Sequence, residues 1–171
     1  MNKQVIVFNG RDRVFLLARL RSILNQCDST RRPKLLAFAI LGNHLHLLFQ
    51  HGAVATEVRR IMSALKRDYA HYFNEQHGTT GPVWESPFRG RVVRGGEELI
   101  NVVTYIHLNP DSSTRDANSS HGIYLGEQPA GIVSTELVLK TFGGRDAYED
   151  YFADTSMIRA ARAAAKRRIN K

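Results

Sequence analysis

Two apolar stretches joined by a very short connection constrain this chain most strongly. Residues 35–41 are almost wholly apolar, residues 44–50 alternate in part, and only residues 42–43 separate them. So short a link favours an antiparallel hairpin of two strands, and the more apolar stretch predicts the central strand. The hairpin is the part of the chain around which we expect the remaining elements to be arranged.

The second strand of this hairpin carries two histidines. Side chains alternate between the faces of a strand, so His44 and His46 are expected to share one face, while Leu45, Leu47 and Phe49 face the core. Two neutral imidazoles on one face can share a metal ion, because each offers one nitrogen lone pair. The alternative is that both histidines only cover the polar face of a half-buried strand.

The other periodic stretches complete an α+β pattern. Alternation predicts strands, and 3.6-residue spacing with suitable end residues predicts helices. The expected strands are residues 4–8 and 89–94, and the expected helices are residues 14–24, 56–76 and 97–108. This order predicts a ferredoxin-like antiparallel sheet of about four strands with helices on it, and a further helix docked beside the sheet.

The last third of the chain reads differently. Residues 111–120 are polar without periodicity, which predicts a linker. Short helices are expected after it, at residues 135–142 and 146–152, followed by Ala-rich, basic helical sequence at residues 156–171. We therefore expect one domain over residues 1–110 and a small helical extension, 111–171, packed on it.

Composition restricts the possible partners and compartments. The chain has 24 Lys and Arg against 16 Asp and Glu, a net charge of +8, which favours a polyanion, although a basic protein can also simply be soluble. Cys27 is the only cysteine, so one chain builds no disulfide framework. No apolar run reaches the roughly 18 residues of a membrane span, and we expect a cytoplasmic protein without a membrane partner.

A second chemical pattern ends the 97–108 helix. Tyr105 and Asn109 are four residues apart and share a helix face, whereas His107 points elsewhere and is not counted as a ligand. An Asn oxygen suits Mg²⁺ or Mn²⁺, and two histidines with this oxygen leave positions open for phosphate and water. A tyrosine hydroxyl in line with such a phosphate could attack phosphorus. A helix tyrosine that only packs is the alternative.

Six side chains are candidates for contact with nucleic acid. Cationic side chains along the 56–76 helix and the 89–94 stretch suit phosphates, and a neighbouring indole suits base stacking. The candidates are Arg59, Lys66, Arg67, Trp84, Arg89 and Arg91. The alternative is a solvated helix face and an aromatic side chain packed under its loop.

Taken together, these motifs resemble the HUH single-tyrosine transposases of the insertion-sequence-200-like group, particularly the REP-associated tyrosine transposase branch. N-H-L-H-L-L at residues 43–48 is similar to that family's HUH motif. Y-I-H-L-N-P at residues 105–110 is similar to its tyrosine motif. Residues 62–74 and 84–93 also resemble the family, as do parts of the C-terminal extension.

The resemblance implies an endonuclease and strand transferase acting on single-stranded or hairpin DNA. It implies that His44, His46 and Asn109 bind Mg²⁺ or Mn²⁺. It also implies that Tyr105 attacks the scissile phosphate, which leaves a 5′-phosphotyrosine and a free 3′-OH whose return attack rejoins the strand. The implied assembly is a monomer or a homodimer, in which Tyr105 of one chain can face the histidines of the other.

Other functions remain open at this stage. After Pro110, residues 111–120 depart from the family pattern, which motivates the alternative of a domesticated, catalytically weak or inactive hairpin-binding protein of the same fold. An RNA-binding ferredoxin-like domain fits less well, because the paired aromatic signature of such domains is missing. A replication initiator or relaxase shares the motifs but not their order in so short a chain.

Overall fold

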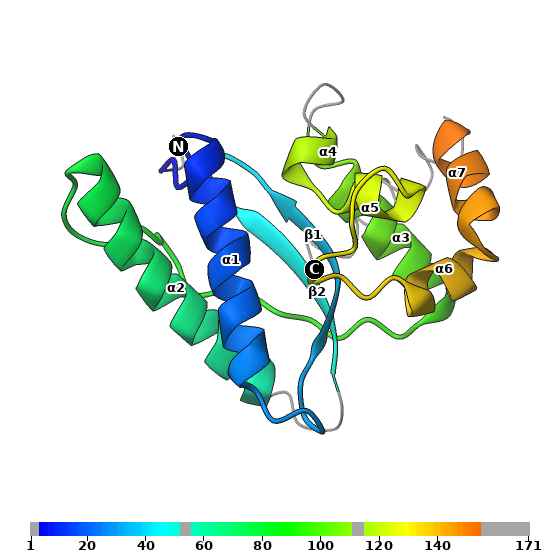
Figure 1. Cartoon of the computed structure of the whole chain (residues 1–171), viewed down its shortest axis with the longest axis horizontal. Helices are drawn as coiled ribbons and strands as arrows, with labels where there is room; N and C mark the ends of the chain where they lie inside the picture. Colours follow the sequence, from blue (N-terminus) through cyan, green and yellow to red (C-terminus); the bar gives the residue numbers. More distant parts are fainter. Residues whose placement is uncertain (1–3, 52–55, 111–114, 155–171) are drawn as a thin grey trace. The chain divides into compact units, whose positions relative to one another are not determined.

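The computed structural model of the chain describes residues 4–51, 56–110 and 115–154 (Figure 1). Its elements are, in order, α1 (Gly10–Gln26), β1 (Lys34–Ile40), β2 (Leu45–Gln50), α2 (Thr56–His77), α3 (Gly96–His107), α4 (Arg115–Asn118), α5 (His121–Leu125), α6 (Glu136–Phe142) and α7 (Arg145–Ala153). The predicted mixture of helices and strands is confirmed. Within the described ranges, however, the sheet has two antiparallel strands, β1 and β2, rather than four.

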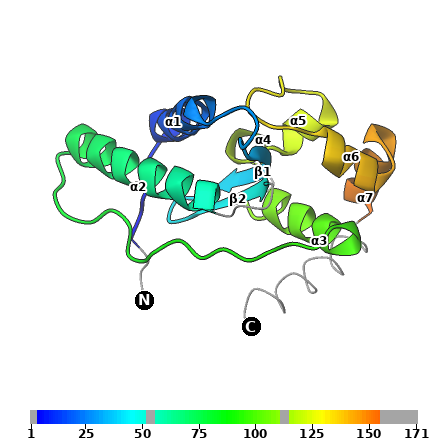
Figure 2. The same cartoon turned by 90° about the horizontal axis from the view of Figure 1, so that it is seen from below.

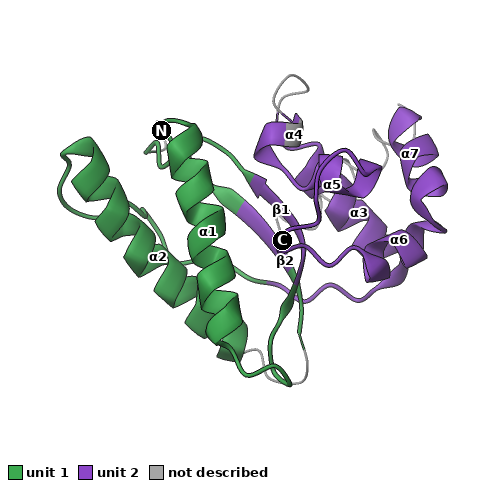
Figure 3. Cartoon of the chain, in the orientation of Figure 1, with its two compact units in different colours: residues 1–34, 40–45, 49–90 green, residues 35–39, 46–48, 91–171 purple. Residues whose placement is uncertain are grey.

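The chain divides into two compact units, and both contain pieces of the hairpin. Unit 1 comprises Met1–Lys34, Ile40–Leu45 and Phe49–Gly90, and unit 2 comprises Leu35–Ala39, His46–Leu48 and Arg91–Lys171 (Figure 3). The middle of each strand thus belongs to unit 2 and the strand ends belong to unit 1.

In unit 1, α1 and α2 pack side by side (Figures 1 and 2). Apolar residues three and four positions apart form a stripe on each helix, and the burial of these stripes stabilises the pair. The most deeply buried are Leu16, Leu20, Ile61, Leu65, Tyr69 and Phe73. An ion pair between Arg19 and Asp68, 2.6 Å apart, also joins the two helices. Both predicted helices are confirmed, and α1 begins four residues earlier than expected.

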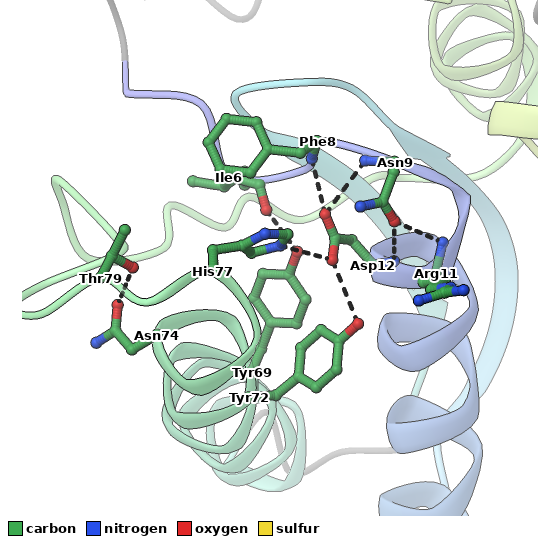
Figure 4. A network of polar contacts seen from close by, with 10 residues as sticks. All are labelled: Ile6, Phe8, Asn9, Arg11, Asp12, Tyr69, Tyr72, Asn74, His77 and Thr79. Carbon is green, nitrogen blue, oxygen red and sulfur yellow. Dashed lines mark hydrogen bonds and ion pairs between the residues drawn. The ribbon is translucent and has the colours of Figure 1, made fainter.

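A buried carboxylate, Asp12, joins the start of α1 to the end of α2 (Figure 4). Its Oδ2 accepts the backbone N–H groups of Phe8 and Asn9, at 2.8 and 3.2 Å, and completes a capping box with Asn9. Its Oδ1 accepts the Tyr72 hydroxyl at 3.3 Å and lies 3.0 Å from Nε2 of His77. Asp12 therefore satisfies N-terminal backbone groups and binds two side chains of α2.

The predicted strand at residues 4–8 is wrong. The amides of Ile6 and Val7 both donate to the single carbonyl of Gly42, at 2.7 and 3.0 Å, instead of forming a ladder. The next amide is taken by Asp12 as part of the helix cap. The helix cap and the hairpin turn already bind these amides. Ile6 and Val7 are therefore buried, as their apolar side chains suggest, but they do not pair as a strand.

The predicted strand at residues 89–94 is also wrong. Its residues are mostly exposed and do not form a strand. Glu98, in the first turn of α3, binds the Arg91 guanidinium at 2.6 Å and the Arg94 backbone N–H at 3.0 Å. This carboxylate thus holds the segment as the loop that leads into α3.

In unit 2, the segment after α3 supplies β1 with partners on the side away from β2. Isolated bridges join Leu35 to Val133 and Ala39 to Ser119, and the Tyr124 hydroxyl donates to the Leu36 carbonyl at 2.6 Å. Every residue from 35 to 40 is buried as a result, as expected for a central strand. The linker predicted at 111–120 is wrong for its described part, because α4 and buried serines occupy residues 115–120.

The described helices of unit 2 are α3 and the four shorter helices α4, α5, α6 and α7. α3 packs against α6, while α7 packs against both α5 and α6. The helices predicted at 97–108, 135–142 and 146–152 are confirmed within one residue, and residues 156–171 lie outside the described part of the chain. None of the helices that the structure describes is long and apolar enough to cross a membrane.

Candidate active site

Unit 2 brings one of the predicted histidines against the predicted tyrosine. His46 comes from β2 and Tyr105 from the last turns of α3, and their rings meet edge to face with centroids 5.4 Å apart and planes at 79°. Both residues are half-buried, and Nε2 of His46 is a buried atom. Two residues that are 59 positions apart in sequence, by their numbers 46 and 105, are therefore neighbours within one chain.

Asn109 lies one turn beyond Tyr105, just after α3. The helix tightens here, since the Leu108 amide donates to Thr104 at 3.0 Å but the Asn109 amide donates to Ile106 at 3.3 Å. The Nδ2 atom of Asn109 is buried and has no hydrogen-bond partner among the described residues. A half-turn of the amide exchanges its oxygen and nitrogen, so this position can offer an oxygen donor to a ligand.

His44 belongs to unit 1 and lies immediately before β2, one residue outside the strand that was predicted to contain it. Its Nδ1 lies 2.5 Å from Oδ1 of Asn43. Because that oxygen can only accept, Nδ1 carries the proton and Nε2 carries the lone pair. With this amide orientation of Asn43, the tautomer of His44 leaves the Nε2 lone pair for a metal ion.

The faces of β2 differ from the expected pattern. Leu48 is the buried residue, whereas Leu45, Leu47 and Phe49 are half-buried. Leu48 shares its strand face with His46, so this face is covered at one end and carries the His46 contact with Tyr105 at the other. Leu45, Leu47 and Phe49, which were predicted to face the core, are thus less buried than Leu48 on the face of His46.

Within the described ranges, no group of three or more His, Cys, Asp and Glu side chains could hold a metal ion. A site made of two imidazoles and an Asn oxygen has a different composition from such groups. The donor types of His44, His46 and Asn109 suit an Mg²⁺ or Mn²⁺ ion that also binds phosphate oxygens.

His107 points away from the candidate site, as expected. It is completely buried, and its two ring nitrogens lie within hydrogen-bonding distance of Tyr148 and Ser120. Burial, together with the neighbouring His121 and Arg115, holds the pKa of His107 well below its usual range, so the ring is neutral. Sequence reasoning missed these partners, because they lie 13 and 41 positions further along the chain and no local pattern links them to His107.

Two of the nucleic-acid candidates are bound to each other in unit 1. The Trp84 indole N–H donates to the Lys66 carbonyl at 2.9 Å, and Lys66 Nζ donates to the Ser86 carbonyl at 2.8 Å and lies 5.5 Å from the indole ring. Burial lowers the pKa of Lys66. These contacts hold the loop after α2 against the helix, which agrees with the packing alternative, and a DNA contact by either residue stays a prediction.

The other candidates present exposed guanidinium groups. Arg59 and Arg89 are exposed, and Arg67 is exposed while its Nε lies 2.9 Å from Asp68. Arg91 belongs to unit 2 and is paired with Glu98. The Arg67 pair is open to water and therefore weak, so a phosphate can compete with Asp68 for this guanidinium.

Within unit 2, a histidine of an antiparallel hairpin thus contacts a tyrosine of a neighbouring helix, which defines the candidate site of this mixed α and β protein. A family model described as "Transposase IS200 like" matches residues 2–109, more than half of the 171-residue chain. The chain therefore belongs to the IS200-like transposase family, whose members act on DNA, and the resemblance inferred from its two motifs is confirmed. Neither the curated proteins nor the solved structures contain a match.

Proposed function

We propose that this protein is a metal-dependent tyrosine transposase that cuts and rejoins single-stranded hairpin DNA. The observation that carries the proposal is the edge-to-face contact of His46 and Tyr105, with centroids 5.4 Å apart, inside the region that the transposase family model matches. A half-buried tyrosine whose ring contacts a histidine fits a nucleophile, which needs both access to substrate and a nearby polar group.

The proposed reaction exchanges one phosphodiester bond for another. The Tyr105 hydroxyl loses its proton to water as its oxygen attacks phosphorus. The bond from phosphorus to the 3′ oxygen breaks, and that oxygen leaves as a hydroxyl after taking up a proton. The product is a 5′-phosphotyrosine, and attack by a 3′-OH reverses the step and rejoins DNA without a nucleotide energy source.

His44, His46 and Asn109 are the residues that would hold the metal ion. Two observations support this donor set: the Asn43 hydrogen bond that leaves Nε2 of His44 as the basic nitrogen, and the buried amide atom of Asn109 without a partner among the described residues. When bound, Mg²⁺ or Mn²⁺ supplies Lewis-acid polarisation of the scissile phosphate. The protein's own part is to orient Tyr105 and to exclude water from its buried edge.

The binding-only alternative is not carried by a specific observation. It was motivated by the unusual residues after Pro110. Two of those residues, Ser119 and Ser120, are buried and bond to β1. The departure from the family pattern therefore does not leave the described residues that follow α3 unpacked.

Removing the metal is expected to abolish covalent capture of DNA. Labelled single-stranded hairpin DNA from the flanks of the protein's own gene is mixed with the protein, with Mn²⁺ or with a chelator, and separated on a denaturing gel. We expect a shifted band with Mn²⁺ only, because the phosphate otherwise lacks its Lewis acid. A retarded complex on a native gel without any covalent band in Mn²⁺ would favour the binding-only protein instead.

The DNA-binding role is tested at Arg89. Arg89→Ala is expected to weaken hairpin binding by about 1 kcal/mol, roughly fivefold, and to lower the salt slope of log K by about 0.7, the value for one phosphate contact to single-stranded DNA. Fluorescence anisotropy over a range of salt concentrations measures both. Arg21→Ala, an equally exposed arginine on α1, is the matched control. Equal losses in both variants would argue against a specific contact at Arg89.

A further inference from the structure

A series of buried hydrogen bonds, called the His107 hydrogen-bond chain below, lies on the side of α3 opposite Tyr105. His107 follows Tyr105 by two residues, and two residues turn a helix by about 200°, so the two side chains leave α3 in nearly opposite directions. Tyr105 meets His46, whereas His107 is 0% exposed and lies in the interior of unit 2. A rotation of α3 about its axis that displaces His107 therefore also displaces Tyr105.

One end of this chain reaches β1. The Nε2 atom of His107 lies 2.7 Å from Oγ of Ser120, and the same Oγ accepts the backbone N–H of Phe38 at 3.0 Å. The Ser120 amide in turn donates to the Phe38 carbonyl at 3.1 Å. Two hydrogen bonds thus join Ser120 to Phe38 of β1, and β1 pairs with β2, the strand that carries His46.

The other end reaches α7 and α5. The hydroxyl of Tyr148 lies 2.8 Å from Nδ1 of His107 and 2.7 Å from Nδ1 of His121. A neutral imidazole has one donor and one acceptor nitrogen. In one arrangement that satisfies all partners, Ser120 donates to His107, His107 donates to Tyr148, and Tyr148 donates to His121; in the reverse arrangement His107 donates to Ser120, whose hydroxyl lies 3.5 Å from the Phe38 carbonyl.

We propose that Ser120, His107 and Tyr148 are positioning residues that fix the rotation of α3 and so hold Tyr105 edge-on to His46. This inference rests on the proposed function for its catalytic meaning, but the geometry that it predicts can be measured without catalysis. All the residues involved belong to unit 2, which contains both sides of the contact.

The position of the Tyr105 hydroxyl is sensitive to small rotations of α3, because the hydroxyl lies far from the helix axis. A helix rotation of about 10° moves a tyrosine hydroxyl by more than about 1 Å, because the ring extends well beyond the 2.3 Å radius of the Cα atoms. Misplacement of a reacting group by about 1 Å can cost about 100-fold in rate. Loss of one hydroxyl in the chain therefore affects the reaction more than it affects DNA binding.

Tyr124 provides a matched control. Like Tyr148 it is 0% exposed, it lies in the same unit, and its hydroxyl also makes a buried hydrogen bond, to the Leu36 carbonyl of β1 at 2.6 Å. Its hydroxyl does not join the chain through His107. Tyr124→Phe should therefore destabilise the protein about as much as Tyr148→Phe while the rotation of α3 is kept.

The test measures the effect of the His46 ring current on the ¹⁹F chemical shift of Tyr105. In protein labelled with 3-fluorotyrosine, Tyr105→Phe identifies the ¹⁹F resonance of Tyr105, and His46→Ala should move it by removing the ring current of His46. We expect this shift to be largely lost in Ser120→Ala and Tyr148→Phe and kept in Tyr124→Phe. All spectra are taken at a temperature where circular dichroism shows each variant to be folded.

A kinetic measurement completes the test. The rate of adduct formation should fall at least about tenfold in Ser120→Ala and Tyr148→Phe with hairpin affinity unchanged, and Tyr124→Phe should retain the rate. His107→Gln, which keeps a donor and an acceptor, should recover part of the rate lost in His107→Leu. A His46-dependent shift that persists in both Ser120→Ala and Tyr148→Phe overturns the positioning role. If the His46-dependent shift is lost in these variants but the unaltered protein forms no adduct, the proposed function is overturned while the positioning geometry stands.

Discussion

Tyr105→Phe is expected to abolish the covalent protein–DNA adduct while hairpin binding survives. The variant loses only the hydroxyl oxygen that would attack phosphorus, and loss of a catalytic nucleophile typically costs about 10⁴-fold or more in rate. The ring itself remains, so the contact with His46 and the packing of α3 are kept. Denaturing gels and mass spectrometry of the trapped complex measure the adduct, and a native gel measures binding.

The control for this experiment is Tyr151→Phe. Tyr151 is also half-buried and also lies in unit 2, where its hydroxyl is 3.4 Å from Thr104 of α3. It lies outside the proposed chemistry, so its variant should form the adduct at close to the normal rate. An undiminished adduct in Tyr105→Phe would exclude Tyr105 as the nucleophile, whereas equal loss in both variants would point to a disturbed α3.

The second large effect is expected on stability. Asp12→Ala should lower the free energy of unfolding by about 2–3 kcal/mol at pH 7, because it removes a helix cap worth about 1 kcal/mol and leaves part-buried donors without their acceptor. The donors that lose their partner are the amides of Phe8 and Asn9 and the Tyr72 hydroxyl. Urea unfolding followed by circular dichroism measures the loss.

The contribution of Asp12 to the free energy of unfolding depends on pH. Burial alone would raise the pKa of Asp12, but hydrogen bonds from Phe8, His77 and Asn9 outweigh it and lower the pKa below its ordinary value of 3.8. A carboxyl with a lowered pKa in the folded state stabilises fully above the pKa of the unfolded chain. We therefore expect its contribution at neutral pH to disappear as the pH falls below about 4.

Asp12→Asn isolates the charge, since it keeps an oxygen acceptor but does not titrate. Its unfolding free energy should fall less steeply than that of the unaltered protein as the pH drops from 5 to 3. Asp146→Asn is the matched control, because Asp146 also lies in the first turn of a helix, α7, but is exposed. Identical acid profiles for Asp12→Asn and the unaltered protein would rule out this role for the Asp12 charge.

Local sequence determined the longer helices and the central strand. The stripe from Ile61 to Phe73 repeats at helical spacing over several turns, so burial of one face requires a helix there whatever its partner is. Residues 35–40 are apolar without interruption, which suits a strand covered on both faces. Both chemical motifs could also be read directly, because His44 with His46, and Tyr105 with Asn109, are close in sequence.

The outer strands could not be predicted, because an alternating pattern describes burial and not pairing. Ile6 and Val7 are buried as a strand residue would be, yet their amides bind one carbonyl of the hairpin turn. Ser119 and Ser120, which look like linker residues, are buried because β1 offers them backbone partners. A partner far away in sequence decided each case, and no local preference reports such a partner.

The same division holds for the candidate site. The sequence by itself determined which chemical groups are available: two imidazoles, one amide and one phenol in motifs that place the chain among the IS200-like transposases. Only the tertiary structure decided that His46 and Tyr105 meet within a single chain, and that His107 turns inward to Ser120 and Tyr148. The physical reason is that spacing along a helix or strand sets the relative direction of neighbouring side chains, whereas contacts between elements depend on how their buried faces pack together.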